Sequence, residues 1–193
     1  MALTSIGRFD ALFVCCMNVV SFVFQDWSAN TNNSKGRLLG VLFRLANYGL
    51  GNPVLRLLLL PYRLLYRVLV EWTLGVELPY NTVVGPGVRI YHGQALVIHR
   101  HARIGRNCVL RQSTTIGNAG RGSACPIIGN NVDIGANVCI IGPVHIGDNV
   151  IIGAGSVVTK SIPDGCTVVG NPARILRRHP AYAEVAPSFS SVP

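Results

Sequence analysis

The sequence predicts a mainly β protein in which a parallel β-helix built from hexapeptide repeats follows an α-helical N-terminal segment. The first observation is a change in composition near Leu78-Pro79, before which aliphatic residues recur at helical spacing. The second is a strict period of six after that point, which is typical of β-helix solenoids. Its unbroken series of aliphatic residues consists of Ile128, Ile134, Ile140, Ile146, Ile152 and Val158.

The N-terminal segment, residues 1–77, is expected to be helical. Between Lys35 and Gly75 the aliphatic spacing is interrupted at Gly51-Asn52-Pro53 and at Pro61, so several short helices are predicted. This stretch carries six basic residues against a single acid. Such a basic, apolar cap can pack on the second half or on neighbouring subunits, and it can also contact an anionic membrane surface. Both alternatives stay open.

The uncharged stretch from Ala11 to Gln25 is short for a transmembrane helix and lacks a clear small-residue cleavage site of a signal peptide. We therefore expect a buried or interfacial helix there. The six cysteines form no C-x-x-C pair, which favours reduced thiols in a cytoplasmic protein over a zinc cluster or a disulfide framework. A cytoplasmic protein of this kind could also associate with the inner face of the membrane, and this alternative stays open.

The charge and the apolar content restrict the partners. The formal net charge is +9, and 49% of the residues are hydrophobic. A phosphate-rich ligand, an anionic membrane or nucleic acid could each match this charge. The basic residues are scattered and do not alternate with aromatic residues, so nucleic acid is not an expected partner. The apolar excess requires burial in a core or between subunits.

The repeat domain, residues 78–176, is expected to stack coils of about 18 residues, since three hexapeptides make one coil. Residues 18 apart would then lie above one another. Gly122 occupies an aliphatic slot of the repeat, so Asn118–Pro126 is expected to leave the coil as a loop. The spacing also predicts one edge of small residues, formed by Gly117, Gly135 and Gly153 with Asn118, Ala136 and Ala154 directly after them.

The repeat domain resembles a known family. From about Val76 to Leu176 the chain resembles the serine O-acetyltransferase group of hexapeptide acyltransferases, and within it the colanic-acid type that acetylates bacterial exopolysaccharides. The matching stretches are Tyr91-His92-Gly93, Thr115-Ile116-Gly117-Asn118, Ala124-Cys125-Pro126, residues 152–158 and residues 169–174. The resemblance implies a left-handed solenoid, a homotrimer or a dimer of trimers, and active sites between neighbouring subunits. It also implies direct acetyl transfer from acetyl-CoA to a hydroxyl, without a metal.

The resemblance implies a catalytic histidine and a carboxylate partner. His92 matches the histidine that acts as general base, and it lies where two extra residues interrupt the period of six. The partner in the family is an aspartate fifteen residues upstream, and this position holds Glu77. A carboxylate at this place would orient the imidazole. Backbone N–H groups near Gly117 and Asn118 are the expected oxyanion donors.

The ligand contacts follow from the same resemblance. The CoA arm would lie along the small-residue edge, with main-chain contacts at Ala136 and Ala154. Its phosphates would meet Lys160 and Arg174. Serine-specific members carry an aspartate before the catalytic histidine and an arginine-histidine pair in the loop, where this chain has Tyr91 and Ala124-Cys125. A saccharide acceptor, in the form of a nucleotide sugar, a lipid-linked oligosaccharide or a finished polymer, is therefore expected. Its predicted contacts are Tyr91, Arg111, Gln112 and Cys125.

Three alternatives remain open. The first is a serine O-acetyltransferase of cysteine biosynthesis. The second is a zinc carbonic anhydrase of the β-helical type, because His99, His101 and His145 could supply three ligands. The third is a solenoid without catalysis. Cys125 as a nucleophile is disfavoured, since no histidine lies near it in sequence. Residues 177–193 are expected to form a mobile C-terminal tail.

Overall fold

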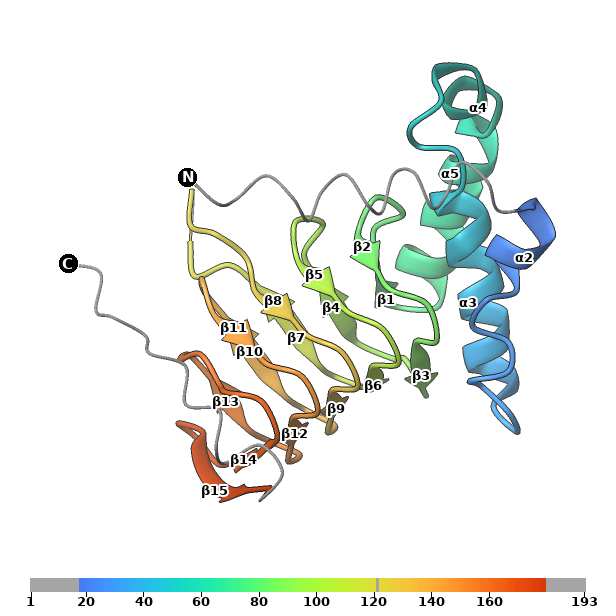
Figure 1. Ribbon diagram of the computed structural model, residues 1–193. Helices are drawn as coiled ribbons and strands as arrows, with labels where there is room; N and C mark the ends of the chain where they lie inside the picture. The colour runs from blue at the N-terminus through green and yellow to red at the C-terminus, as the bar shows by residue number, and fades with distance from the viewer. Residues whose placement is uncertain (1–17, 121, 180–193) are drawn as a thin grey trace, which may run out of the picture.

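The computed structural model describes residues 18–120 and 122–179, and its helices form a cap at one end of a solenoid (Figure 1). The first part of the predicted apolar stretch, up to Met17, and the tail from Pro180 lie outside the described residues. An asparagine side chain accepts from a backbone N–H at the starts of three helices, as expected of an N-cap. The helices are α2 (Val19–Val23), α3 (Ser34–Asn47), α4 (Pro53–Leu58), α5 (Leu60–Tyr66) and the π-helical segment η1 (Arg67–Thr73).

The solenoid contains three sheets, which we name A, B and C. Sheet A has the order β1-β4-β7-β10-β13, sheet B the order β2-β5-β8-β11, and sheet C the order β3-β6-β9-β12-β14-β15. All strand pairs are parallel except β14 with β15. The predicted parallel β-helix with preceding helices is thereby confirmed. The strands are β1 (Val76–Glu77), β2 (Val83–Val84), β3 (Arg89–Tyr91), β4 (Leu96–Ile98), β5 (Arg103–Ile104), β6 (Val109–Arg111), β7 (Thr115–Gly117), β8 (Ile127–Ile128), β9 (Asp133–Ile134), β10 (Cys139–Ile141), β11 (His145–Ile146), β12 (Ile151–Ile152), β13 (Val157–Val158), β14 (Cys166–Val169) and β15 (Arg174–Arg178).

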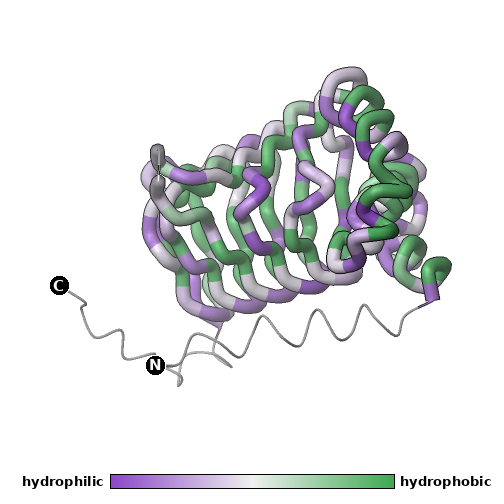
Figure 2. Tube along the Cα trace, turned by 90° about the horizontal axis from the view of Figure 1, so that it is seen from above, coloured by the Kyte–Doolittle hydropathy of each residue, from purple (hydrophilic) through white to green (hydrophobic). Residues whose placement is uncertain are grey.

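The hexapeptide period forms the core. The aliphatic residues at every sixth position point into the solenoid and are buried, together with the valines between them. Figure 2 shows hydrophobic segments recurring along the coils and long hydrophobic stretches at the helical end. Each coil thus buries its apolar side chains only against the coils above and below it, as expected of a repeat protein.

One predicted stacking relationship is wrong. Val97 pairs with Thr115, 18 residues later, but Thr115 pairs with Cys139, 24 residues later. The six additional residues lie between β7 and β8, in the loop that the sequence predicts to leave the coil. Gly117 therefore ends a strand of sheet A beside Ile141, whereas Gly135 and Gly153 follow strands of sheet C. The loop takes up six residues that would otherwise form one face of a coil. The period of six therefore continues after the loop, but each later residue lies on a different sheet from the one that a period of 18 predicts.

A buried ion pair attaches the cap to the first coil. The Arg44 guanidinium lies 2.7 Å from the Asp26 carboxylate, and both side chains are 3% exposed. Arg44 also donates to the carbonyl oxygens of Val84 and Gly85. Asp26 accepts from the backbone N–H groups of Gly87 and Val88. The pair therefore satisfies backbone groups of the first coil as well as its own charges.

Two asparagines cover the open edge of sheet C. The Asn30 side chain donates to the Val88 carbonyl and accepts from the Ile90 N–H, and Asn33 donates to the Ile90 carbonyl. β3 is the first strand of sheet C and has no neighbouring strand on this side. The asparagine side chains form the hydrogen bonds that such a neighbour would form. They hold the end of β3, and the residue that follows it, in a fixed position.

Candidate active site

The turns that lead from sheet C into sheet A form one continuous edge, which we call the C–A corner. It comprises residues 92–95, 112–114, 135–138 and 153–156. Backbone hydrogen bonds join successive turns: Ser113 N–H to Gln94, Asn137 N–H to Gln112 and Gly155 N–H to Ala136, at 2.8, 3.1 and 2.9 Å. Coils of a parallel sheet lie about 4.8 Å apart, so the four turns span roughly 14 Å along the axis.

His92 occupies the first turn of this corner. Arg89 of β3 and Val97 of β4 are eight residues apart, while their partners Val109 and Thr115 are six apart, which places the two extra residues in the His92 turn. His92 has a φ of 65° and its side chain is exposed. The additional residues push this turn outward and present the imidazole at the surface of the corner.

Gly93 allows this turn to lie against the cap. It has a φ of 75°, a left-handed conformation that glycine adopts without strain. A Cβ atom there would lie 3.1 Å from the Leu39 side chain of α3. The His92 turn is therefore packed directly on the helical cap.

Glu77 lies on the coil preceding His92. It is exposed on β1 and pairs in register with Val97, while the Ala95 N–H of the His92 turn donates to the Gly75 carbonyl just before β1. The two predicted catalytic residues thus lie on adjacent coils, His92 in the C–A corner and Glu77 on sheet A just after this corner. The ion pairs in the described part of the chain do not include Glu77 with His92.

A second carboxyl beside Glu77 was missed by the sequence reasoning. Glu71 of η1 pairs with Arg67, and its side chain is 12% exposed. Burial raises the pKa of Glu71, Arg67 opposes this rise, and the charge of Glu77 adds to it. No pattern in the sequence marks this neighbourhood, because it depends on how η1 packs against β1.

Two predicted acceptor contacts adjoin His92 on sheet C. Tyr91 and Arg111 pair in register, and the Arg111 guanidinium lies 5.8 Å from the Tyr91 ring centroid. Arg111 also forms an ion pair with Asp133 and donates to the Ile134 carbonyl. Its charge is therefore already matched within the chain, which leaves it poorly suited to clamp a free carboxylate.

Gln112 carries an unsatisfied acceptor at the next turn of the corner. Its side-chain Oε1 is buried and has no hydrogen-bond partner. Buried polar atoms nearly always form a hydrogen bond, so an unpaired acceptor at this place is consistent with a hydrogen bond from a bound ligand. Among the described residues, Thr82 Oγ1 is the other buried side-chain atom in this condition.

The predicted CoA contacts fall into two groups. Ala136 and Ala154 follow each other along the C–A corner, in line with His92. Lys160 and Arg174 line one cleft of about 370 Å³ near the C-terminal end of the solenoid, beside Thr159 and Ala173. Arg174 pairs with Val169 at the end of β14, near the C–A corner, whereas Lys160 follows β13 of sheet A on the A-to-B side. Small residues along the corner and a cation beyond it suit a long ligand with a phosphate-bearing end.

Gly117, Asn118 and Cys125 lie instead on the corner where sheet A leads into sheet B, which we call the A–B corner. Asn118 Nδ2 donates to the Gly120 carbonyl and so holds the start of the loop. Sheet A separates these residues from His92 of the same chain. They therefore do not share an edge with Ala136 and Ala154.

The fold brings a histidine to Cys125. Its Sγ lies 3.0 Å from His99 Nδ1, and the His101 N–H donates to the same nitrogen. Nδ1 is thus an acceptor, and the thiol is its second donor. Burial raises the pKa of Cys125, which keeps the thiol protonated. The sequence-based statement that no histidine is near Cys125 holds only along the chain.

In the parts that the structure describes, no group of three or more His, Cys, Asp or Glu residues is placed to hold a metal ion.

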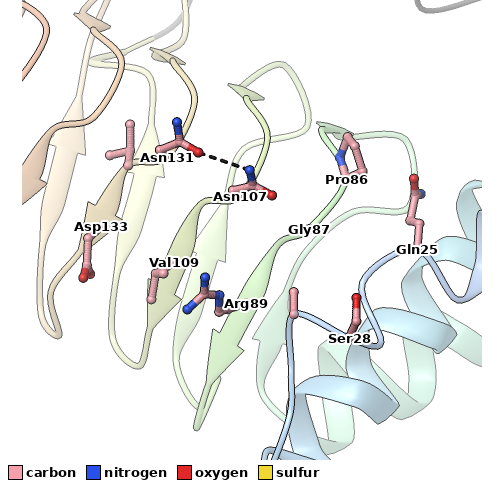
Figure 3. A pocket seen from close by; sticks show the side chains of 11 residues that line it. Gln25, Ser28, Pro86, Gly87, Arg89, Asn107, Val109, Asn131 and Asp133 are labelled. Carbon is pink, nitrogen blue, oxygen red and sulfur yellow. Dashed lines mark hydrogen bonds between the residues drawn. The ribbon is translucent and has the colours of Figure 1, made fainter.

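An open polar cleft of about 700 Å³ lies on sheet C beside the cap (Figure 3). Arg89, Asn107, Asn131 and Asp133 line it from the solenoid. Gln25, Ser28 and Ala29 line it from the segment between α2 and α3. Arg89 precedes Tyr91 by two residues on β3, so both side chains project from the same face. The sequence reasoning did not identify this cleft.

Comparisons with known proteins identify the family of this chain. The family profile named Bacterial transferase hexapeptide (six repeats) matches residues 125–160. The chain is 37% identical over 158 residues to a protein of Escherichia coli K12 named Putative colanic acid biosynthesis acetyltransferase WcaB, covering 79% of this chain and 98% of that protein. The chain belongs to the hexapeptide-repeat acetyltransferases. It is accordingly an acetyltransferase.

Serine acetyltransferases are further members that resemble this hexapeptide-repeat acetyltransferase. That of Synechococcus elongatus is 42% identical over 106 residues, which cover 54% of this chain and 43% of that one. The soybean apoenzyme structure superposes with a TM-score of 0.71 at 29% identity, covering 87% and 73% of the two chains. A Brucella abortus serine acetyltransferase in complex with coenzyme A gives 0.70 at 25% identity, covering 88% and 72%.

Proposed function

We propose that this hexapeptide-repeat acetyltransferase transfers the acetyl group of acetyl-CoA to a hydroxyl of a saccharide, in the biosynthesis of a bacterial exopolysaccharide or capsule. The observation that carries the proposal is the alignment of His92, Gln112, Ala136 and Ala154 along the C–A corner. A base at one end of a narrow edge and small residues along it fit a thioester arm that delivers its acyl group to the base. No protein metal is required for this reaction.

In this mechanism His92 is the general base. The imidazole accepts the proton of the acceptor hydroxyl while the oxygen of this hydroxyl attacks the carbonyl carbon of the thioester. Backbone N–H groups would bind the resulting oxyanion. When the tetrahedral intermediate collapses, the carbon–sulfur bond breaks and the imidazolium returns its proton to the departing thiolate. Acetyl transfer is direct, and no acyl-enzyme forms.

Glu77 is proposed to orient His92 and to stabilise the imidazolium. Its position on the adjacent coil, level with Val97 just after the His92 turn, supports this role. The nearby Glu71 is mostly buried and paired with Arg67, so Glu77 is the better-exposed carboxyl for this purpose.

A homotrimer, or a dimer of trimers, is part of the proposal. Gly117, Asn118 and Cys125 lie on the A–B corner, and His92 lies on the C–A corner of the same chain. If the A–B corner of one subunit meets the C–A corner of the next, the two groups of predicted site residues form one site. The separation of the two groups within one chain supports this arrangement.

The acceptor is proposed to be a saccharide because this chain has Tyr91, Ala124 and Cys125 where serine-specific members carry charged residues. Serine would bring two opposite charges into the site, and an unpaired buried charge costs several kcal/mol, on the order of 3–5. Arg111 is neutralised by Asp133, and Cys125 is a neutral thiol. Tyr91 instead offers an aromatic face and a hydroxyl to a pyranose. The relative named for colanic acid biosynthesis supports the same substrate class.

We propose that the reaction takes place in the cytoplasm, where acetyl-CoA is available. Peripheral contact with the inner membrane surface would give the enzyme access to a lipid-linked acceptor. The described helices include none that is long and apolar enough to cross a membrane. A peripheral contact needs no such helix.

Steady-state kinetics test the proposal. We expect CoA release with a panel of free, nucleotide-linked or lipid-linked saccharides and little release with L-serine. A serine acetyltransferase is the second candidate, favoured by the similarity to the soybean and Synechococcus elongatus proteins. A kcat/KM for L-serine of about 10⁴ M⁻¹s⁻¹ or more would decide for that candidate.

A further inference from the structure

The outer face of the helices after Asn52 is apolar where a surface helix is normally polar. Across α5 and η1, Arg63, Tyr66 and Val70 are buried against the rest of the molecule. On the opposite side exposed apolar residues outnumber the exposed charged residues, which are Arg56 and Arg67. Its exposed residues, which we call the leucine face, are Val54, Leu57, Leu58, Leu60, Leu64, Leu65, Val68, Leu69 and Trp72.

This face is extensive, and its central helix α5 is hydrogen-bonded to its neighbours. Leu57 and Leu58 are 72% and 67% exposed, Trp72 is 76% exposed, and α4 has no buried residue. Figure 1 shows α4 projecting beyond the solenoid at the cap end. The buried Arg63 donates to the carbonyls of Ala46, Tyr48 and Arg56, which ties α5 to both neighbouring helices. A contiguous exposed apolar patch of this kind marks an interaction site.

The charges around the leucine face favour an anionic partner. Arg56 and Arg67 lie exposed among its apolar residues. Glu71 is the acid of these three helical elements, and it is mostly buried and paired with Arg67. The whole chain carries a formal charge of +9. A second copy would present the same positive charges, whereas an anionic bilayer complements them and accepts the leucines and the tryptophan.

We infer that the leucine face binds the surface of an anionic membrane, with α4 and α5 lying in the interface between head groups and acyl chains. Tryptophan and aliphatic residues beside arginines are the composition of such interfacial helices. The inference rests on the proposed function only for its purpose, which is to bring the His92 corner to a lipid-linked saccharide. Membrane binding itself requires no acceptor.

Vesicle sedimentation tests the inference. The full-length protein should sediment with vesicles of phosphatidylcholine and phosphatidylglycerol at 3:1 and should not sediment with pure phosphatidylcholine. The double variant Leu57→Glu/Leu58→Glu should bind on the order of tenfold more weakly. Leu176→Glu is the matched control, because Leu176 is 70% exposed on β15, at the far end of the solenoid. It should bind as the unsubstituted protein does.

A second measurement locates the contact. The chain has two tryptophans, so Trp27→Phe leaves Trp72 as the sole reporter, and brominated lipid should quench its emission. Failure to sediment, equal binding to uncharged vesicles, or sedimentation without quenching overturns the inference. So does a change of oligomeric state in Leu57→Glu/Leu58→Glu, measured by light scattering, with unchanged vesicle binding. If the protein binds vesicles but acetylates no saccharide, the proposed function fails and the membrane inference stands.

Discussion

Cys125 Sγ and His99 Nδ1 lie 3.0 Å apart at the A–B corner, although 26 residues separate them in the chain. A cysteine beside a histidine suggests a thiolate nucleophile. Here Nδ1 already accepts the His101 N–H, and burial raises the pKa of the Cys125 thiol. The pair is therefore a neutral hydrogen bond, which can shape an acceptor site but is not poised to attack a thioester.

Cys125→Ser should consequently retain turnover within about an order of magnitude, because a hydroxyl can donate the same hydrogen bond. Intact-mass measurement during turnover should reveal no acetylated protein. Since the thiol pKa is raised, alkylation of Cys125 by iodoacetamide should be slow near pH 8 and should accelerate only above the ordinary thiol range. Loss of all activity together with an acetyl adduct in the parent protein would contradict direct transfer.

His92→Ala should lower kcat by on the order of 10² to 10⁴ while leaving the affinity for acetyl-CoA nearly unchanged, because it removes only the base. Initial rates of CoA release with a saccharide acceptor measure this. His145→Ala is the control, since His145 is exposed on β11 of sheet B, away from the C–A corner. Near-normal turnover of His92→Ala would exclude it as the base.

Glu77→Gln should reduce kcat strongly and change the KM for the acceptor little, as expected for a residue that orients the base. Glu71→Gln should act on stability instead. The pKa of Glu71 is raised in the folded protein, so its protonated form is favoured by folding, and stability is lost as pH rises through the folded pKa. Thermal unfolding should show Glu71→Gln gaining stability at neutral pH and little at pH 4. An equal kcat loss in both variants would argue against a specific role for Glu77.

Gln112→Leu should separate stability from binding. Removing a buried unpaired acceptor should raise the free energy of unfolding by about 1 kcal/mol. It should also raise KM for acetyl-CoA or for the acceptor about five- to tenfold, if Oε1 accepts a hydrogen bond from either ligand. Among the described residues, Thr82 Oγ1 is the other unpaired buried side-chain atom and lies outside the corner, so Thr82→Val should stabilise without changing KM. Unchanged KM values in Gln112→Leu would leave this glutamine without a ligand role.

Asp26→Asn should destabilise the protein by about 3–5 kcal/mol in urea unfolding, because it leaves the Arg44 charge buried without its partner. Arg67→Gln, which breaks the more exposed pair with Glu71, should cost about 1 kcal/mol or less. If Asp26→Asn cost no more than Arg67→Gln, the cap would not depend on the buried pair.

The period of six was sufficient to predict the strands, because each buried aliphatic residue must face the same axis. It could not place Gly117, since the loop after this residue removes six residues from the stack and leaves the period intact. The His92 turn was visible as two extra residues. The contacts of Asp26, Asn30 and Asn33 with the first coil had no sequence signal, because an asparagine that completes a sheet edge looks like one in any turn.

The antiparallel strand β15 has a consequence for self-association. Every coil of a solenoid is a template for the next, so an uncovered last coil could add a coil from another molecule and start a fibre. At one end of sheet C, Asn30 and Asn33 occupy the hydrogen-bonding groups of β3. At the other end β15 runs against β14 and presents Arg174, Arg177 and Arg178, whose like charges repel a second copy. Growth of the stack is thus blocked at both ends of this sheet, by side-chain amides at one and by reversed chain direction and charge at the other.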